Sequence, residues 1–247
     1  MSRPVFVSDA EHTAGVAVGD VVILDGPEGR HAATVRRIGL GEQVDLVDGA
    51  GVRLTGEVVA AGKADLDIRV DAVSREAPLE PRFVLVQALA KGDRDDQAIE
   101  AATELGVDVV VPWQAQRSIV QWRAERGAKA RQRWVDTVRA AGKQSRRSRF
   151  PEVWDLVDLR GVVALTHGAS AAYVLHEEAT EPLAAQAVPA QGDVLLVVGP
   201  EGGITPAELE ALAAASAKVV RLGSTVLRSS SAGPAALAVL SAASRWR

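Results

Sequence analysis

The feature that most constrains the fold is a series of short apolar runs, each about the length of one strand, that alternate with helical segments. In the stretch LLVVGPEGGITPAELE (195–210), an apolar run breaks into glycines and reopens as an amphipathic helix. Thr205 and Glu208 form a capping box there, with proline at the first helical position. Further apolar runs that predict buried strands lie at 83–89, 107–113, 162–166, 171–176 and 218–223. This alternation indicates an α/β fold with a mostly parallel sheet covered by helices on both faces.

The first 73 residues have a different pattern. Short β-prone runs are separated by Gly/Asp turns, which is typical of a small barrel or sandwich. These runs lie at 21–24, 43–47, 52–59 and 66–70. The polar segment 71–81 contains two prolines and has no periodicity, so it is predicted to be a linker. The sequence therefore predicts two domains, a β domain at 1–73 and an α/β domain at 74–247.

Composition excludes several classes of site. The chain has no cysteine, so disulfides, thiolate metal ligands and cysteine nucleophiles are absent, and its four histidines are too widely spaced for a zinc centre. No apolar run has the length of a membrane span, and the first residues lack the apolar core of a signal peptide. We therefore expect a cytoplasmic protein without a metal site or a membrane partner.

Charge is segregated along the chain. The net charge is -4, yet residues 117–149 contain eleven lysines or arginines and only two acidic residues. Such a segment is expected of a face that meets nucleic acid phosphates. A solvated basic helix explains the same composition, and composition alone leaves both interpretations open. Trp113, Trp122 and Trp134 lie among or beside these charges, where an exposed ring could stack on a base and a buried ring would pack in the core.

Two glycine-broken strand ends are the candidate ligand loops. GPEGG (199–203) precedes a helix N-terminus, but it matches neither the Walker loop nor the GxGxxG fingerprint, and Glu201 would repel a polyphosphate. A second loop, LGSTVLR (222–228), precedes an apolar helix that Ser230 or Ser231 could cap. The two loops could build one pocket from backbone groups, or they could be unrelated turns.

Taken in order, these motifs resemble the RsmE family of SPOUT methyltransferases, which methylate uracil N3 in 16S rRNA. The resemblance rests on GPEGG and LGxxVLR together with KGDR (91–94), ATELGV (102–107), RS (117–118), QS (144–145), Arg147 and Pro151. It implies methylation of a uridine near the decoding centre of the small ribosomal subunit, with S-adenosyl-L-methionine as cofactor. It further implies an N-terminal PUA-like β-barrel, which His31 and GEQVDLVDG (41–49) fit, a C-terminal SPOUT domain with a deep trefoil knot, and a homodimer.

The resemblance also assigns residues. The residues implied to bind the cofactor are Leu175, His176, Glu177, Gly199, Pro200, Glu201, Gly202, Gly203, Leu222, Gly223, Val226 and Leu227. Those implied to hold RNA are Arg94, Arg117, Gln144 and Arg147. Arg228 is the catalytic candidate, because a cation would stabilise the charge that develops on the uracil oxygens. A helix-start arginine paired with an acid is the alternative. We also hypothesise that Glu201 lies near the cofactor sulfonium.

The chain departs from the family pattern at several positions. Ser230 stands where many relatives have glutamate, and Lys143 and Arg146 replace the usual Glu and Gly. An acid/base role at position 230 is therefore in doubt, and neither His176 nor His31 is well placed as the base. Two other functions remain open: a non-catalytic RNA-binding or ribosome assembly protein, and a metabolic enzyme with a nucleotide cofactor.

Overall fold

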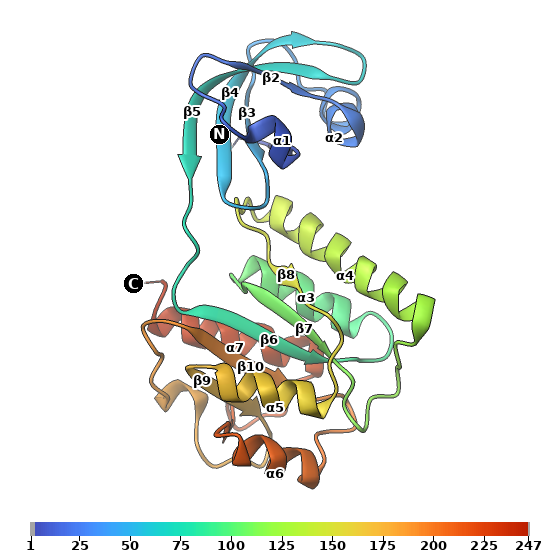
Figure 1. Ribbon diagram of the computed structural model, residues 1–247, viewed down its shortest axis with the longest axis vertical. Helices are drawn as coiled ribbons and strands as arrows, with labels where there is room; N and C mark the ends of the chain where they lie inside the picture. Colours follow the sequence, from blue (N-terminus) through green and yellow to red (C-terminus); the bar gives the residue numbers. More distant parts are fainter. Residues whose placement is uncertain (1–2, 247) are drawn as a thin grey trace. The chain divides into compact units, whose positions relative to one another are not determined.

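The computed structural model describes residues 3–246 (Figure 1). These residues form two compact units, which are described separately. The β unit contains the residues up to Pro78 together with Gly142–Phe150, and the α/β unit contains Leu79–Ala141 and the residues from Pro151 onward. Compact units follow contacts within the chain, so the predicted domain limits 1–73 and 74–247 stay a prediction.

The β unit is built on a five-stranded sheet with the order β1-β3-β4-β5-β2. Only the β1–β3 pair is parallel. The strands are β1 (Val5–Val7), β2 (Val21–Leu24), β3 (Gln43–Val47), β4 (Val52–Ala61) and β5 (Leu66–Arg75), with helices α1 (Ala10–Thr13) and α2 (Gly26–Arg30) and the π-helical turn η1 (His31–Val35). Alternate residues of β4, among them Leu54 and Val58, are buried in the core of this unit.

Two features of the β unit correct the sequence prediction. Strand β5 continues to Arg75, so the first half of the predicted linker 71–81 is strand, because Ala72 and Val73 pair with β4. The segment Gly142–Phe150 packs within this unit, where Phe150 contacts a buried cluster of β1 and β3 valines. A polar composition did not reveal the first feature, and no local pattern indicates the second.

The α/β unit is built on a six-stranded sheet with the order β11-β9-β10-β6-β7-β8, and all of its described pairs are parallel. This confirms the predicted parallel sheet. Its strands are β6 (Arg82–Ala88), β7 (Val109–Trp113), β8 (Glu152–Val153), β9 (Ala171–Leu175), β10 (Asp193–Val198) and β11 (Lys218–Val220). The central strands β6 and β10 are buried along almost their whole length, as their continuous apolar runs predict.

Helices cover both faces of this sheet (Figure 1). They are α3 (Arg94–Glu104), α4 (Ala124–Gln144), α5 (Leu159–Gly168), α6 (Pro206–Ala214) and α7 (Ser229–Ala243), with the short 3₁₀ turn η2 (Leu183–Ala185). The side chains of Val84 and Val86 face the cluster that includes residues of α5 and α6, whereas Leu85 contacts Gly233 of α7, which packs beside α3. The alternation along β6 thus assigns one helix pair to each face.

Two local predictions in the α/β unit are wrong. The run 162–166 was predicted to be a strand and is helical, because Asp158 caps α5 by accepting a hydrogen bond from the Gly161 amide at 3.0 Å. Helix α7 begins at Ser229, so Ser230 and Ser231 lie inside its first turn and do not cap it; Arg228 holds the N-cap position without a side-chain hydrogen bond. The knot implied by the resemblance stays a prediction.

Candidate cofactor cleft

Three strand ends place the candidate loops side by side. Strands β11, β9 and β10 are neighbours in the parallel sheet, so the loops that follow Val220, Leu175 and Val198 leave the sheet at one edge. Ligands bind at this edge in open α/β sheets, because helix N-termini and free backbone groups gather there. The order of strands therefore brings together loops that are separated in sequence.

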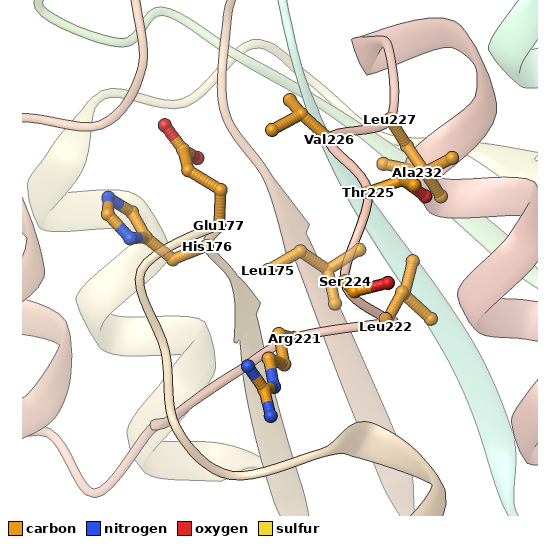
Figure 2. A pocket seen from close by; sticks show the side chains of 11 residues that line it. Leu175, His176, Glu177, Arg221, Leu222, Ser224, Thr225, Val226, Leu227 and Ala232 are labelled. Carbon is orange, nitrogen blue, oxygen red and sulfur yellow. The ribbon is translucent and has the colours of Figure 1, made fainter.

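These loops enclose a cleft of about 820 Å³. A smaller pocket adjoins it between the end of β9 at Leu175 and the loop that carries Leu222 and Val226 (Figure 2). All twelve residues implied to bind the cofactor line the cleft or this pocket. Arg94, Arg117 and Arg228 also line the cleft, whereas Gln144 and Arg147 lie in the β unit. Contact of these residues with a cofactor stays a prediction.

The first loop, Gly199–Gly203, is held by hydrogen bonds. The Glu201 carboxylate accepts from the Arg94 guanidinium at 2.9 Å and from the Lys91 amide at 3.2 Å. Burial alone would raise the pKa of Glu201, but the backbone hydrogen bonds and the Arg94 charge outweigh it and lower that pKa. Glu201 is therefore an ionised anchor between its own loop and the KGDR turn.

Arg117 holds the same loop from another side, since its guanidinium donates to the Gly202 carbonyl at 2.9 Å. A side chain at position 199 would place its Cβ only 2.6 Å from Ile204, which explains why glycine fits there. Arg94 and Arg117, both expected to hold RNA, thus make structural contacts to the candidate cofactor loop. The sequence prediction did not anticipate this role, although KGDR and RS singled out both residues.

The second loop, 222–228, is open. Val226 is 76% exposed and Leu227 is 39% exposed. Within residues 3–246, positions 222–227 make no hydrogen bond, and the Arg228 guanidinium has neither a hydrogen bond nor an ion pair. The alternative in which Arg228 pairs with an acid is therefore not found in the described chain. Arg228 presents an uncompensated positive charge at the N-terminus of α7, whose helix dipole has the same sign.

Other polar groups of the cleft have defined partners or surroundings. His176 is half-buried, and its Nδ1 accepts a hydrogen bond from the Glu178 amide at 3.2 Å. Ser229, which the sequence analysis did not select, lines the cleft and has a buried hydroxyl without a hydrogen-bond partner in the described chain. Its place in a run of three serines gave no signal that distinguished it from Ser230.

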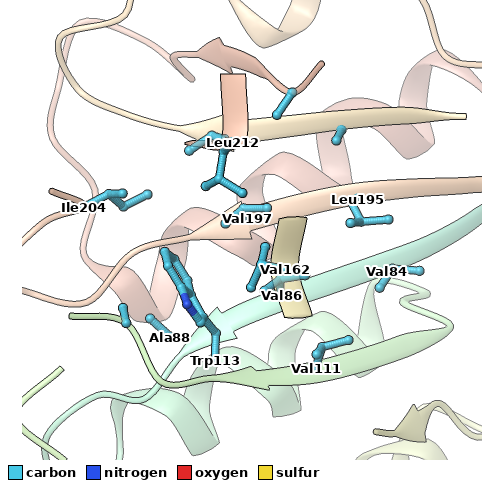
Figure 3. Close-up of a cluster of buried hydrophobic side chains, with 14 of the residues drawn as sticks. Val84, Val86, Ala88, Val111, Trp113, Val162, Leu195, Val197, Ile204 and Leu212 are labelled. Carbon is cyan, nitrogen blue, oxygen red and sulfur yellow. The ribbon is translucent and has the colours of Figure 1, made fainter. Parts of the chain in front are cut away.

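The tryptophans divide between core and surface. Trp113 is buried in the main apolar cluster beside Val86 and Val162 (Figure 3), and Trp134 is also fully buried, which confirms core packing for both. Trp122 is only half-buried, with its ring edge-on to Trp134 at 5.0 Å between centroids. Trp122 is thus the remaining candidate for stacking on a base.

Searches for two other kinds of feature were negative over residues 3–246. No helix there is both long and apolar enough to cross a membrane. The same residues contain no group of three or more histidine, cysteine or acidic side chains that could hold a metal ion.

Comparisons with known proteins agree with this architecture. Residues 76–241 match a family model described as an RNA methyltransferase domain, and residues 24–71 match an RNA methyltransferase PUA domain. The chain is 45% identical over 233 residues to ribosomal RNA small subunit methyltransferase E of Mycobacterium tuberculosis, covering 92% of this chain and 89% of that protein. It is 28% identical to the Bacillus subtilis protein of the same name, with 88% of each covered. The fold matches a Neisseria gonorrhoeae crystal structure of that name bound to S-adenosyl methionine, with TM-score 0.85, 28% identity and 98% of both chains covered.

Proposed function

The chain belongs to the family of ribosomal RNA small subunit methyltransferase E, and we propose that it transfers a methyl group from S-adenosyl-L-methionine to N3 of a uridine in the decoding region of bacterial 16S rRNA. The observation that carries this proposal is the cleft at the edge of the parallel sheet, which gathers both glycine loops and the unpaired Arg228. We place the reaction in the cytoplasm, on the assembled small subunit.

The residues of the cleft fit this cofactor. Gly199, Gly202 and Gly223 leave backbone groups approachable, and exposed Val226 and Leu227 offer apolar surface to an adenine ring. We assign cofactor binding to the twelve cleft residues that the sequence analysis named. When bound, S-adenosyl-L-methionine supplies a methyl group on a cationic sulfur, which is activated for attack by a nucleophile.

Arg228 is assigned the catalytic role. Uridine N3 carries a proton and becomes a good nucleophile only after that proton leaves. An arginine that stabilises the negative charge on O2 or O4 favours the ionised base. Arg228 has no competing partner in the described chain and stands at a helix N-terminus, so its charge is available to the substrate.

RNA binding is assigned to both units. Arg94 and Arg117 line the cleft and would contact RNA with the part of each side chain that remains exposed, while Gln144 and Arg147 would contact it from the β unit. The PUA-like domain at 1–73 would widen the footprint and favour the assembled subunit, and the domain at 74–247 would carry out the transfer. We further propose a homodimer, in which the partner covers the exposed apolar edge of the second loop; light scattering tests this.

The decisive experiment measures transfer of labelled methyl to unmodified bacterial small subunits, with naked 16S rRNA and large subunits as controls. N3-methyluridine in digested 16S rRNA from small subunits is the expected product. The matched pair Arg228→Gln and Arg123→Gln should separate catalysis from general charge loss, because only Arg228 lines the cleft. Cofactor binding without transfer to any of the three substrates would refute the proposed substrate. Absence of cofactor binding as well would favour the non-catalytic RNA-binding function.

A further inference from the structure

The α/β unit contains a second hollow that the proposed function does not use. Its volume is about 500 Å³, and it lies between the turn that follows β6, the segment before α4, and the first turns of α4. The residues that line it are Ala90, Gly92, Asp95, Val120, Gln121, Trp122, Arg126, Lys129, Ala130 and Arg133.

Three cations of α4 border this hollow. Arg126, Lys129 and Arg133 are spaced by three and four residues, so they share one face of the helix. Arg133 pairs with Asp96 at 3.0 Å, whereas Arg126 and Lys129 are exposed and have no hydrogen bond or ion pair within residues 3–246. Two positive charges therefore remain available for an anionic partner.

The acidic side of the hollow is weak. Asp95 is the only acidic residue in its lining and is 2% exposed. Burial and the neighbouring Asp96 charge raise the pKa of Asp95 to about 6, so a small fraction of it stays protonated at neutral pH. The field at the mouth of the hollow is consequently dominated by the α4 cations.

An aromatic ring stands beside these cations. Trp122 packs edge-on against buried Trp134, and its Cβ lies close to the backbone at Gly127, so the ring is fixed before any partner arrives. A rigid, half-exposed ring beside free cations is the arrangement that binds unpaired nucleotides, since the ring stacks on a base and the cations meet the phosphate. An acidic peptide would use the cations but would have no need of the ring.

The hollow connects with the cofactor cleft along the KGDR turn. A third depression is lined by Lys91, Gly92, Asp93, Arg94 and Gln97. It shares Gly92 with the α4 hollow and Arg94 with the cleft. A chain that enters the cleft therefore has a continuous path to Trp122 across a surface that carries Lys91 and Arg94.

We propose that the α4 hollow is a second RNA subsite, which holds an unpaired nucleotide flanking the methylated uridine, with its base against Trp122 and its phosphate at Arg126 and Lys129. This inference rests on the proposed function, because it assumes an RNA substrate whose target base sits in the cleft. It adds a substrate requirement: the strand beside the target must be unpaired.

The charge test compares two double variants of the full chain. Arg126→Gln with Lys129→Gln removes the free cations of the hollow, and Arg139→Gln with Arg160→Gln removes two exposed charges that line none of the described hollows. Binding of unmodified small subunits is measured across a salt series. The slope of log affinity against log salt should fall by roughly 0.7 to 0.9 per lost phosphate contact in the first variant. The second should show little change, and cofactor affinity should be equal in both.

The stacking test uses Trp122→Ala and Trp122→Phe. Loss of one stacked base should weaken RNA binding about fivefold or more for Ala, and Phe should restore most of it. KM for the small subunit should rise with kcat nearly unchanged. Thermal unfolding identifies any loss of fold through the Trp134 contact, in which case the charge pair remains the test.

Three outcomes would overturn the inference. Equal losses in the two charge variants would mean that only general electrostatics is at work. Competition by polyglutamate, combined with an intact response of Trp122→Ala to RNA, would indicate an acidic protein partner. If the unmodified chain itself neither binds nor methylates small subunits, the proposed function fails first, and that result is distinguishable because every variant then behaves alike.

Discussion

The two glycine loops of the cleft differ in how firmly the protein holds them. Gly199–Gly203 is anchored by the Glu201 carboxylate and by the Gly202 carbonyl, both of which bind arginines from other elements. Positions 222–227 make no hydrogen bond in the described chain, and Val226 is largely exposed. One wall of the cleft is therefore fixed in advance, while the other is free to order.

This difference suggests a division of roles in binding. A preorganised wall costs little ordering entropy when a small molecule arrives, whereas an open wall loses conformational freedom at that moment. In exchange, an open wall can close over its occupant or meet a partner subunit. We therefore expect changes in the first loop to affect folding and binding together, and changes in the second to affect binding alone.

The largest contrast should come from one substitution made in both loops. Gly199→Ala places a methyl group 2.6 Å from Ile204, which is buried, so we expect the free energy of unfolding to fall by about 1–3 kcal/mol. Gly223→Ala meets nothing within 4 Å and should change it by less than about 0.5 kcal/mol. Urea unfolding measures both, and equal effects would contradict the proposed difference between the walls.

A smaller effect is expected from the second anchor of the first loop. Arg117→Ala removes the hydrogen bond to the Gly202 carbonyl, which should cost about 0.5–1.5 kcal/mol of stability and weaken cofactor binding several-fold. Arg123→Ala is the control, because it lies nearby in sequence and lines neither part of the cleft. Calorimetric titration with S-adenosyl-L-methionine would expose a failure of the idea as identical affinities in the two variants.

The ion pair of Glu201 makes the anchoring of the first loop dependent on pH. The folded state lowers the pKa of Glu201 below its usual 4.5, so its contribution is fully present above pH 4.5 and is lost as pH falls through the lowered value. Glu201→Gln should reduce stability at pH 7 by up to about 1 kcal/mol, because the pair is partly exposed. The difference from the unmodified chain should disappear in acid; a difference that grows in acid would reverse the assigned sign.

The smallest effect on folding is expected at the tip of the second loop. Val226→Ser replaces an exposed apolar side chain and should change the unfolding free energy by less than about 0.5 kcal/mol. If the loop orders over the cofactor or a partner, the same change should weaken binding measurably. Val18→Ser is the control, because Val18 is 65% exposed and lies in the β unit. Unchanged affinity in both variants would show that the open wall takes no part in binding.

Local patterns in the sequence predicted the secondary structure where they were long or well marked. The capping box at Thr205 is present with both of its hydrogen bonds, and the central strands follow their apolar runs. The run 162–166 failed because five apolar residues suit a strand and one turn of a buried helix equally well. The linker prediction failed because backbone pairing with β4 does not require apolar side chains.

The gathering of the cofactor residues came from resemblance to a family, and not from their spacing. By itself the sequence determined which segments are apolar, where charge is concentrated and which turns contain glycine, because each of these depends on neighbouring residues. Only the tertiary structure decided that Arg94 and Arg117 hold the first loop, since their partners lie 107 and 85 residues away. Contacts over such separations depend on the order of strands in the sheet, and no local periodicity encodes that order.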